Sequence, residues 1–208
     1  MKLKTLSQLT LDGVTQGNGG ASDEDRRGGF DRGGWATGAG DDTTREHIAA
    51  TYQRADAFLF GRRTYELFLE SWGTIDEMRR HPVGVALNSK PKYVASRTLT
   101  EPKWANTTVL GEDLFAAIAE LKASGTGELQ VPGSSLLIQW LLEKDLVDEM
   151  ELMIVPVILG QGARLFAKAG RRIAMSLVDS RADSRGVTTQ TLRPAGRGES
   201  ATSRSRDV

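Results

Sequence analysis

Two arginines and a threonine stand where a short apolar run gives way to an amphipathic segment. The run covers residues 57–60; Gly61 ends it, and Arg62, Arg63 and Thr64 follow at once. This order predicts a strand, a tight turn and the start of a helix. The first N–H groups of a helix are unpaired and carry the positive end of the backbone dipole, which favours an anion. With the arginines added, residues 61–64 are a candidate site for the phosphates of a nucleotide.

Two further predicted strand ends carry donors of the same kind. They are Ser96, Arg97 and Thr98 after one strand, and Val131, Gly133, Ser134 and Ser135 at the end of another. Glycine lets a ligand approach the backbone closely, and serine adds hydroxyl donors. Taken singly, the first segment is more often an ordinary polar turn, and the second is more often a capped helix. The arginine turn alone is as often an ordinary surface turn as a binding site.

The three segments together favour a dinucleotide. In a parallel sheet the carboxyl ends of the strands share one edge, which is where ligands bind. Arginine at two of the three ends suits a phosphate beyond the pyrophosphate. Since a charge-assisted hydrogen bond contributes about 1.5–3 kcal/mol, two could favour NADP over NAD by roughly two orders of magnitude. The predicted cofactor is therefore NADPH.

Composition excludes several other functions. The 27 Lys and Arg residues balance the 27 Asp and Glu residues, so the chain has no net positive charge that would favour binding to nucleic acid or an anionic membrane. Cysteine is absent, which removes disulfides, thiolate metal sites and cysteine nucleophiles. His47 and His81 lack ligand spacing and are expected at the surface, so no metal site is predicted. Without a signal peptide or a membrane-length apolar run, we expect a cytoplasmic protein.

The order of elements predicts an α/β fold. Strands are expected at residues 4–11, 57–60, 91–96, 107–110, 128–132, 149–159 (interrupted by Pro156), 176–179 and 187–192. Helices are expected from Thr43 or Thr44 to Ala55, after Gly61, at 114–121 behind an Asp113 cap, and at 136–144 behind a Ser134 cap. This alternation favours a single domain, residues 1–193, with a mostly parallel central sheet flanked by helices and a C-terminal antiparallel hairpin. Residues 194–208 are predicted to be a flexible tail.

Residues 13–40 form a long glycine-rich segment that contains Phe30 and Trp35. A loop of this length in a compact domain is usually functional or disordered, and the aromatic residues argue against simple disorder.

Four segments in this order resemble the dihydrofolate reductase-like superfamily. The closest resemblance is to stand-alone relatives of the reductase domain of bifunctional riboflavin biosynthesis proteins (the deaminase-reductase C-terminal domain). The segments are residues 11–14, 59–66, 92–99 and 146–166, with Gly133-Ser134-Ser135 where the family carries its cofactor-binding glycine and serine. The resemblance covers roughly residues 3 to 192 and implies the dihydrofolate reductase-like fold.

The resemblance also implies a function. The chain would be an NADPH-dependent oxidoreductase that passes hydride to a C=N or C=O group of a small heterocyclic or sugar-phosphate-like substrate, similar to 5-amino-6-(5-phosphoribosylamino)uracil reductase. Residues 61–64 would hold cofactor phosphates, 96–98 the adenosine 2′-phosphate and 133–135 the pyrophosphate. The substrate pocket would include Asp12, Trp35, Leu159, Gly160, Gln161 and Gly162, under a lid formed by the glycine-rich loop with Phe30 or Trp35 as its wall.

Several points stay open at the level of sequence. No proton donor is assigned. For the acidic residue with which dihydrofolate reductases hold the pterin, Glu46, on the helix that follows the loop, is the nearest candidate. A nucleotide-binding sensor or partner-binding protein without turnover is the alternative function, and a structural protein that binds no nucleotide is a third. The apolar segment 136–142 and the β-rich segment 150–159 suggest a homodimer, although burial in the core would also explain them.

Overall fold

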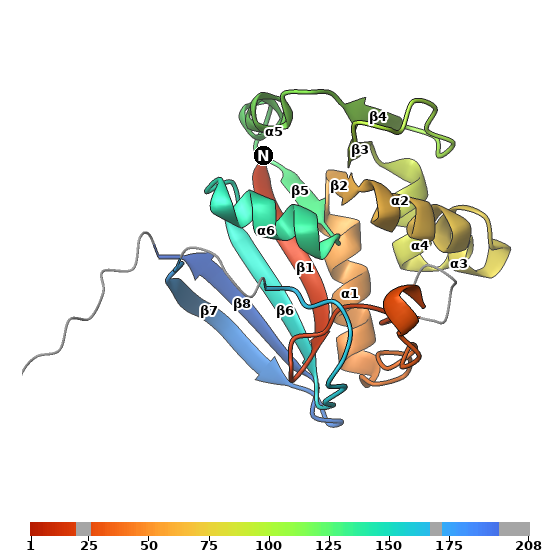
Figure 1. The fold of residues 1–208 in the computed structure, drawn as a ribbon, viewed down its shortest axis with the longest axis vertical. Coiled ribbons are helices and arrows are strands. Elements are labelled where there is room, and N and C mark those ends of the chain that lie inside the picture. Colours follow the sequence, from red (N-terminus) through yellow and green to blue (C-terminus); the bar gives the residue numbers. More distant parts are fainter. Residues whose placement is uncertain (20–25, 167–171, 196–208) are drawn as a thin grey trace, which may run out of the picture.

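The computed structural model of the 208-residue chain describes residues 1–19, 26–166 and 172–195 (Figure 1). The strands are β1 (Lys2–Thr10), β2 (Ala57–Gly61), β3 (Lys92–Ala95), β4 (Thr107–Leu110), β5 (Glu128–Val131), β6 (Glu149–Val155), β7 (Met175–Ala182) and β8 (Thr188–Pro194). The α-helices are α1 (Asp42–Arg54), α2 (Arg62–Phe68), α3 (Asp76–Arg80), α4 (Pro82–Ser89), α5 (Leu114–Ala123) and α6 (Ser135–Glu143). A 3-10 turn at Arg27–Gly29 and a π turn at Leu69–Gly73, which continues α2, complete the described elements.

The described strands form one sheet in the order β4-β3-β2-β5-β1-β6-β8-β7. The strands from β4 to β6 in this order run parallel, whereas β8 pairs antiparallel with both β6 and β7. Both features confirm the predicted α/β fold, including its C-terminal hairpin. β1 lies between β5 and β6, so an early strand sits at the centre of the sheet.

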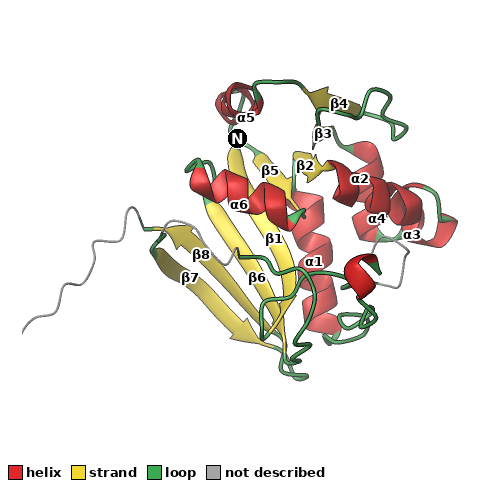
Figure 2. Ribbon diagram, viewed as in Figure 1, coloured by secondary structure: helices red, strands yellow, loops and turns green. Residues whose placement is uncertain are grey.

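Helices cover both faces of this sheet (Figure 2). Alternation along β1 directs Leu3 and Leu9 to the face covered by α5 and α6, and Leu6 to the face covered by α1 and α4. Each face has its own buried apolar cluster, and the β2 side chains between Ala57 and Gly61 are buried on both faces. Such a doubly covered strand explains the continuous apolar run in the sequence.

The structure moves several predicted boundaries. β1 covers residues 2–10 instead of 4–11, and β6 ends at Val155 because Pro156 cannot donate a ladder hydrogen bond. Helix α1 is capped by Asp41 and not by a threonine, since the Asp41 carboxylate accepts from Thr43 N and Thr44 N. The short helices α3 and α4 were not predicted. The predicted tail lies, from residue 196 onward, outside the described residues.

Two lysines stabilise the carboxyl ends of helices by donating to carbonyl groups. Lys90 Nζ donates to the carbonyl of Ala55, just after α1. Lys92, which is fully buried, donates from Nζ to Leu87 O at 2.7 Å and to Lys90 O at 2.9 Å, at the end of α4. Its ammonium also lies 4.9 Å from the centroid of the Trp104 ring. Burial lowers the pKa of Lys92 to about 8.

Among the residues that the structure describes, no helix is both long and apolar enough to cross a bilayer.

Candidate functional site

The loops singled out in the sequence leave the sheet at one edge. They follow β3, β2, β5, β1 and β6, which are neighbours in this order and all run in the same direction. The prediction that these strand ends are adjacent is therefore confirmed. Which ligand they hold stays a prediction.

The β2 and β5 loops touch through two glycines. Gly61 N donates to Gly133 O at 3.4 Å, and a Cβ atom on Gly61 would lie 2.5 Å from Ser134 Oγ. Gly133 has a φ of +149° and faces Thr64, whose methyl and hydroxyl groups would lie 3.2 Å from an added Cβ. Ser134 is the N-cap residue of α6 as predicted, but its side chain makes no capping hydrogen bond and lies against Gly61 instead.

Arg62 connects the β2 loop to the β3 loop. Its Nη1 donates to Thr98 Oγ1 at 2.6 Å, and its Nε donates to Glu66 Oε1 at 2.8 Å, one helical turn along α2. The β3 loop is itself ordered by Ser96 Oγ, which accepts from Thr98 N at 3.2 Å. Arg63 and Arg97 are exposed beside this pair. Three arginines thus lie at the ends of two neighbouring strands, and Arg62 faces a carboxylate.

Asp12 joins the β1 loop to the loop after β6. Its carboxylate accepts from Thr10 Oγ1 at 2.6 Å, from Leu159 N at 3.2 Å and from Gly160 N at 2.9 Å, and Arg164 Nη2 lies 3.2 Å away. These hydrogen bonds, that from the Thr10 hydroxyl foremost, hold the pKa of Asp12 well below its usual range. Asp12 is therefore an ionised structural clamp between two loops predicted to border the substrate.

The glycine-rich loop packs on the same β6 loop. Phe30 is buried with Val14 and Leu159, and Trp35 packs against this cluster. Trp35 Nε1 also donates to Gln16 O at 2.8 Å, and Gln161 Nε2 donates to Asp31 Oδ1 at 2.6 Å. A Cβ atom on Gly162 would collide with Phe30, 2.9 Å from Cε2. The structure therefore brings Trp35 and residues 159–162 together, as predicted, through direct contacts with the loop.

A small cavity of about 70 Å³ lies between α1, the end of the glycine-rich loop and the α1 face of β1 and β6. It is lined by Gln8, Ala36, Gly38, Ala39, Gly40, Thr44, Arg45, Ile48, Met153, Val155 and Val187. None of the predicted substrate residues belongs to this lining. Sequence reasoning missed Gln8, whose Oε1 accepts from Asn18 Nδ2 at 3.0 Å, because it is one of several polar residues in β1.

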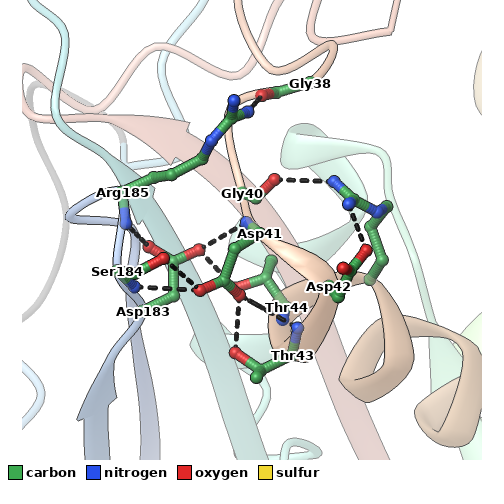
Figure 3. Close-up of polar contacts among 10 residues, drawn as sticks. Gly38, Gly40, Asp41, Asp42, Thr43, Thr44, Asp183, Ser184 and Arg185 are labelled. Atoms are coloured by element: carbon green, nitrogen blue, oxygen red, sulfur yellow. Dashed lines mark hydrogen bonds and ion pairs between the residues drawn. The ribbon is translucent and has the colours of Figure 1, made fainter.

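The wall of this cavity is fixed by a clasp formed by Asp41, Asp183 and Ser184 (Figure 3). Asp183 Oδ2 accepts from Asp41 N at 2.9 Å and from Thr44 Oγ1 at 2.8 Å. In return, Asp41 Oδ2 accepts from Ser184 N at 3.0 Å and from Ser184 Oγ at 2.6 Å. The clasp ties the tip of the β7–β8 hairpin to the start of α1.

The acidic and imidazole candidates on α1 lie away from the cavity lining. Glu46 is exposed. His47 was expected at the surface, but its side chain is only 17% exposed, and its Nε2 lies 2.8 Å from Glu151 Oε1 on β6. Arg181 of β7 contacts its Nδ1. No group of three or more His, Asp or Glu residues in the described ranges is arranged to hold a metal ion.

A mostly parallel sheet flanked by helices that ends in an antiparallel hairpin is the dihydrofolate reductase-like fold. The family profile described as the RibD C-terminal domain matches residues 2–189. The chain therefore belongs to the RibD C-terminal domain family, which confirms the predicted resemblance.

Two individual proteins are similar to the chain. The chain is 31% identical over 137 residues to an uncharacterized protein, YyaP, of Bacillus subtilis (strain 168), covering 64% of this chain and 70% of YyaP. It is 25% identical to a putative riboflavin biosynthesis protein from Shewanella sp. PV-4, with a TM-score of 0.71 and coverage of 93% of this chain and 99% of that one.

Two more distant structures share the fold. A deaminase/5-amino-6-(5-phosphoribosylamino)uracil reductase from Thermotoga maritima is 15% identical, with a TM-score of 0.62. The match covers 93% of this chain but only 56% of that protein. Dihydrofolate reductase from Enterococcus faecalis, in complex with NADP(H), is 11% identical with a TM-score of 0.58, covering 94% of this chain and 97% of that one.

Proposed function

We propose that this protein is an NADPH-dependent reductase that transfers hydride to a C=N or C=O group of a small heterocyclic or sugar-phosphate-like substrate. The observation that carries the proposal is the contact among three strand ends. Arg62 reaches Thr98 of the β3 loop, and Gly61 contacts Gly133 of the β5 loop. Phosphate-compatible donors from three loops thus meet at one edge of the sheet, where α/β folds bind nucleotides.

The residues present suit the phosphates of such a cofactor. Arg62 and Arg97 would hold the 2′-phosphate together with Thr98, because a guanidinium matches phosphate geometry. Glycine at positions 61 and 133 lets the β2 and β5 loops pack against each other, which places Ser134 and the start of α6 beside the start of α2, where a pyrophosphate would bind. When bound, the nicotinamide would supply the hydride, and the protein would orient the substrate and exclude water.

The cavity beside α1 is the candidate position for the group that accepts the hydride. Its lining combines apolar side chains, among them Ile48 and Met153, with the Gln8 amide and Arg45. Its volume of about 70 Å³ is well below the roughly 300 Å³ at which ligand pockets begin. Binding a heterocycle therefore requires residues 36–40 to move away from β1 and β6.

One observation favours the second candidate, a nucleotide-binding protein without turnover. Arg45 is the single ionisable side chain among the described residues that line the cavity, and guanidinium is a poor proton donor at neutral pH. NADPH oxidation over a panel of pyrimidines, pterins and carbonyl compounds separates the candidates. A reductase accelerates oxidation with at least one compound, whereas a sensor binds NADPH and oxidises it at the background rate throughout.

The cofactor itself is tested by titrating NADPH and NADH into wild type and an Arg62→Ala/Arg97→Ala variant. We expect wild type to prefer NADPH, and the variant to lose about 100-fold in NADPH affinity with little change for NADH, since two charge-assisted bonds are removed. An Arg79→Ala/Arg80→Ala variant on α3 removes the same charge elsewhere and should behave as wild type. Equal losses for both nucleotides would overturn the role in 2′-phosphate binding.

A further inference from the structure

Arg62, one of the arginines of the proposed cofactor site, is paired with a carboxylate of its own helix. Arg62 Nε donates to Glu66 Oε1 at 2.8 Å, and the two side chains are 42% and 44% exposed. The same guanidinium uses Nη1 to bond Thr98 across the loops. The guanidinium therefore donates to two groups. The Thr98 hydroxyl can lie beside a bound phosphate, whereas the Glu66 carboxylate repels one.

The Arg62–Glu66 pair is poorly arranged to stabilise α2. Arg62 is the first residue of the helix, where the backbone dipole disfavours a cation, and an arginine four residues before a glutamate is the weaker order of an i,i+4 pair. Both side chains are also well exposed, and exposed ion pairs contribute little. The position of Glu66 is therefore better explained by what it does to Arg62 than by helix stability.

A phosphate that binds Arg62 must share the guanidinium with this carboxylate. A phosphomonoester carries nearly two negative charges at neutral pH. At about 5 Å in a water-like dielectric, the repulsion between such a group and a carboxylate weakens binding about tenfold, and physiological salt reduces this to about threefold. A 2′-hydroxyl meets no such repulsion, and it can donate to the carboxylate instead.

We infer that Glu66 is a specificity-determining residue that limits the preference for the 2′-phosphorylated dinucleotide. This inference rests on the proposed function. The Glu66 carboxylate competes with the 2′-phosphate for Arg62. The protein therefore binds NADPH less tightly, and NADH relatively more tightly, than it would with its arginines alone.

The test compares Glu66→Gln with wild type by titration of NADPH and NADH at low salt and at 0.5 M salt. Glutamine keeps the size and the hydrogen-bond acceptor but removes the charge. We expect NADPH affinity to rise about 3–10-fold at low salt, less at high salt, and NADH affinity to stay equal or fall. Glu70→Gln, the same change one turn further on, should leave both affinities unchanged.

Each outcome has a distinct meaning. If Glu66→Gln binds NADPH no better than wild type, or more weakly, then Glu66 merely positions Arg62 and the inference is wrong while the cofactor assignment survives. If Glu70→Gln gives the same gain, the effect is one of net charge and Glu66 has no special role. If wild type binds neither nucleotide, the proposed function fails and the inference fails with it.

Discussion

At the scale of single residues, Lys92 gives the fold an unusual dependence on pH. Its ordinary pKa of 10.5 falls to about 8 in the native protein because of burial. Between these values the unfolded chain binds a proton that the native chain has released, so the free energy of unfolding rises with pH. We expect wild type to gain about 1–2 kcal/mol between pH 8 and 10 relative to Lys92→Met. Denaturant titrations at both pH values measure this difference, and parallel curves for the two proteins would contradict it.

At the same scale, the sequence predicted which side chains at strand ends lie close together, whereas their role stays a prediction. The rule that parallel strands end at one edge was enough to bring Arg62, Thr98 and Gly133 together. It could not find Glu66 as the partner of Arg62, because an exposed arginine has several acceptors within reach. It also could not show that Asp12 is engaged by Leu159 N and Gly160 N, more than a hundred residues away in the chain.

At the scale of elements, the clasp of Figure 3 determines where α1 begins. Burial alone would raise the pKa of Asp183, but hydrogen bonds from Asp41 N, Thr44 Oγ1 and nearby amides lower it overall. We expect Asp183→Ala to reduce the free energy of unfolding by about 1–2 kcal/mol, since several donors lose their acceptor. Hydrogen exchange should increase in residues 38–44. Asp179→Ala, an exposed change on the neighbouring strand β7, is the control, and equal effects of the two changes would rule out the clasp.

The same clasp explains why the predicted helix start was wrong. Residues 41–44 are Asp-Asp-Thr-Thr, and all four are good N-cap residues. Local sequence cannot rank them, and the choice of Asp41 depends on Ser184 and Asp183 in the distant hairpin.

Helices α3 and α4 were not predicted for a related reason. They have 5 and 8 residues, too few for a clear period. Helix α4 packs on the sheet through Val83, Ala86 and Leu87, and α3 packs against α4.

At the scale of the whole molecule, the homodimer suggested by the sequence stays a prediction. Leu136 on α6 is 70% exposed, so the apolar helix predicted from the sequence is not fully covered by the core of its own chain. Leu177 on β7 is also exposed, at 60%. We expect light scattering to give twice the chain mass, and Leu136→Glu to shift it toward the monomer. Val85→Glu on α4, also a change at an exposed apolar residue, should have no effect. A monomeric wild type would contradict the prediction.

The central place of β1 has a consequence for synthesis. Its two neighbours, β5 and β6, begin at residues 128 and 149. At about 5–20 residues per second, the ribosome needs roughly 6–25 s to make the first partner after β1 has emerged. Throughout that interval a strand that carries Leu3, Leu6 and Leu9 has both edges unpaired and is exposed to the cell. The middle of the finished sheet is thus the part of the nascent chain that waits longest for its partners, and the part where a chaperone would be needed first.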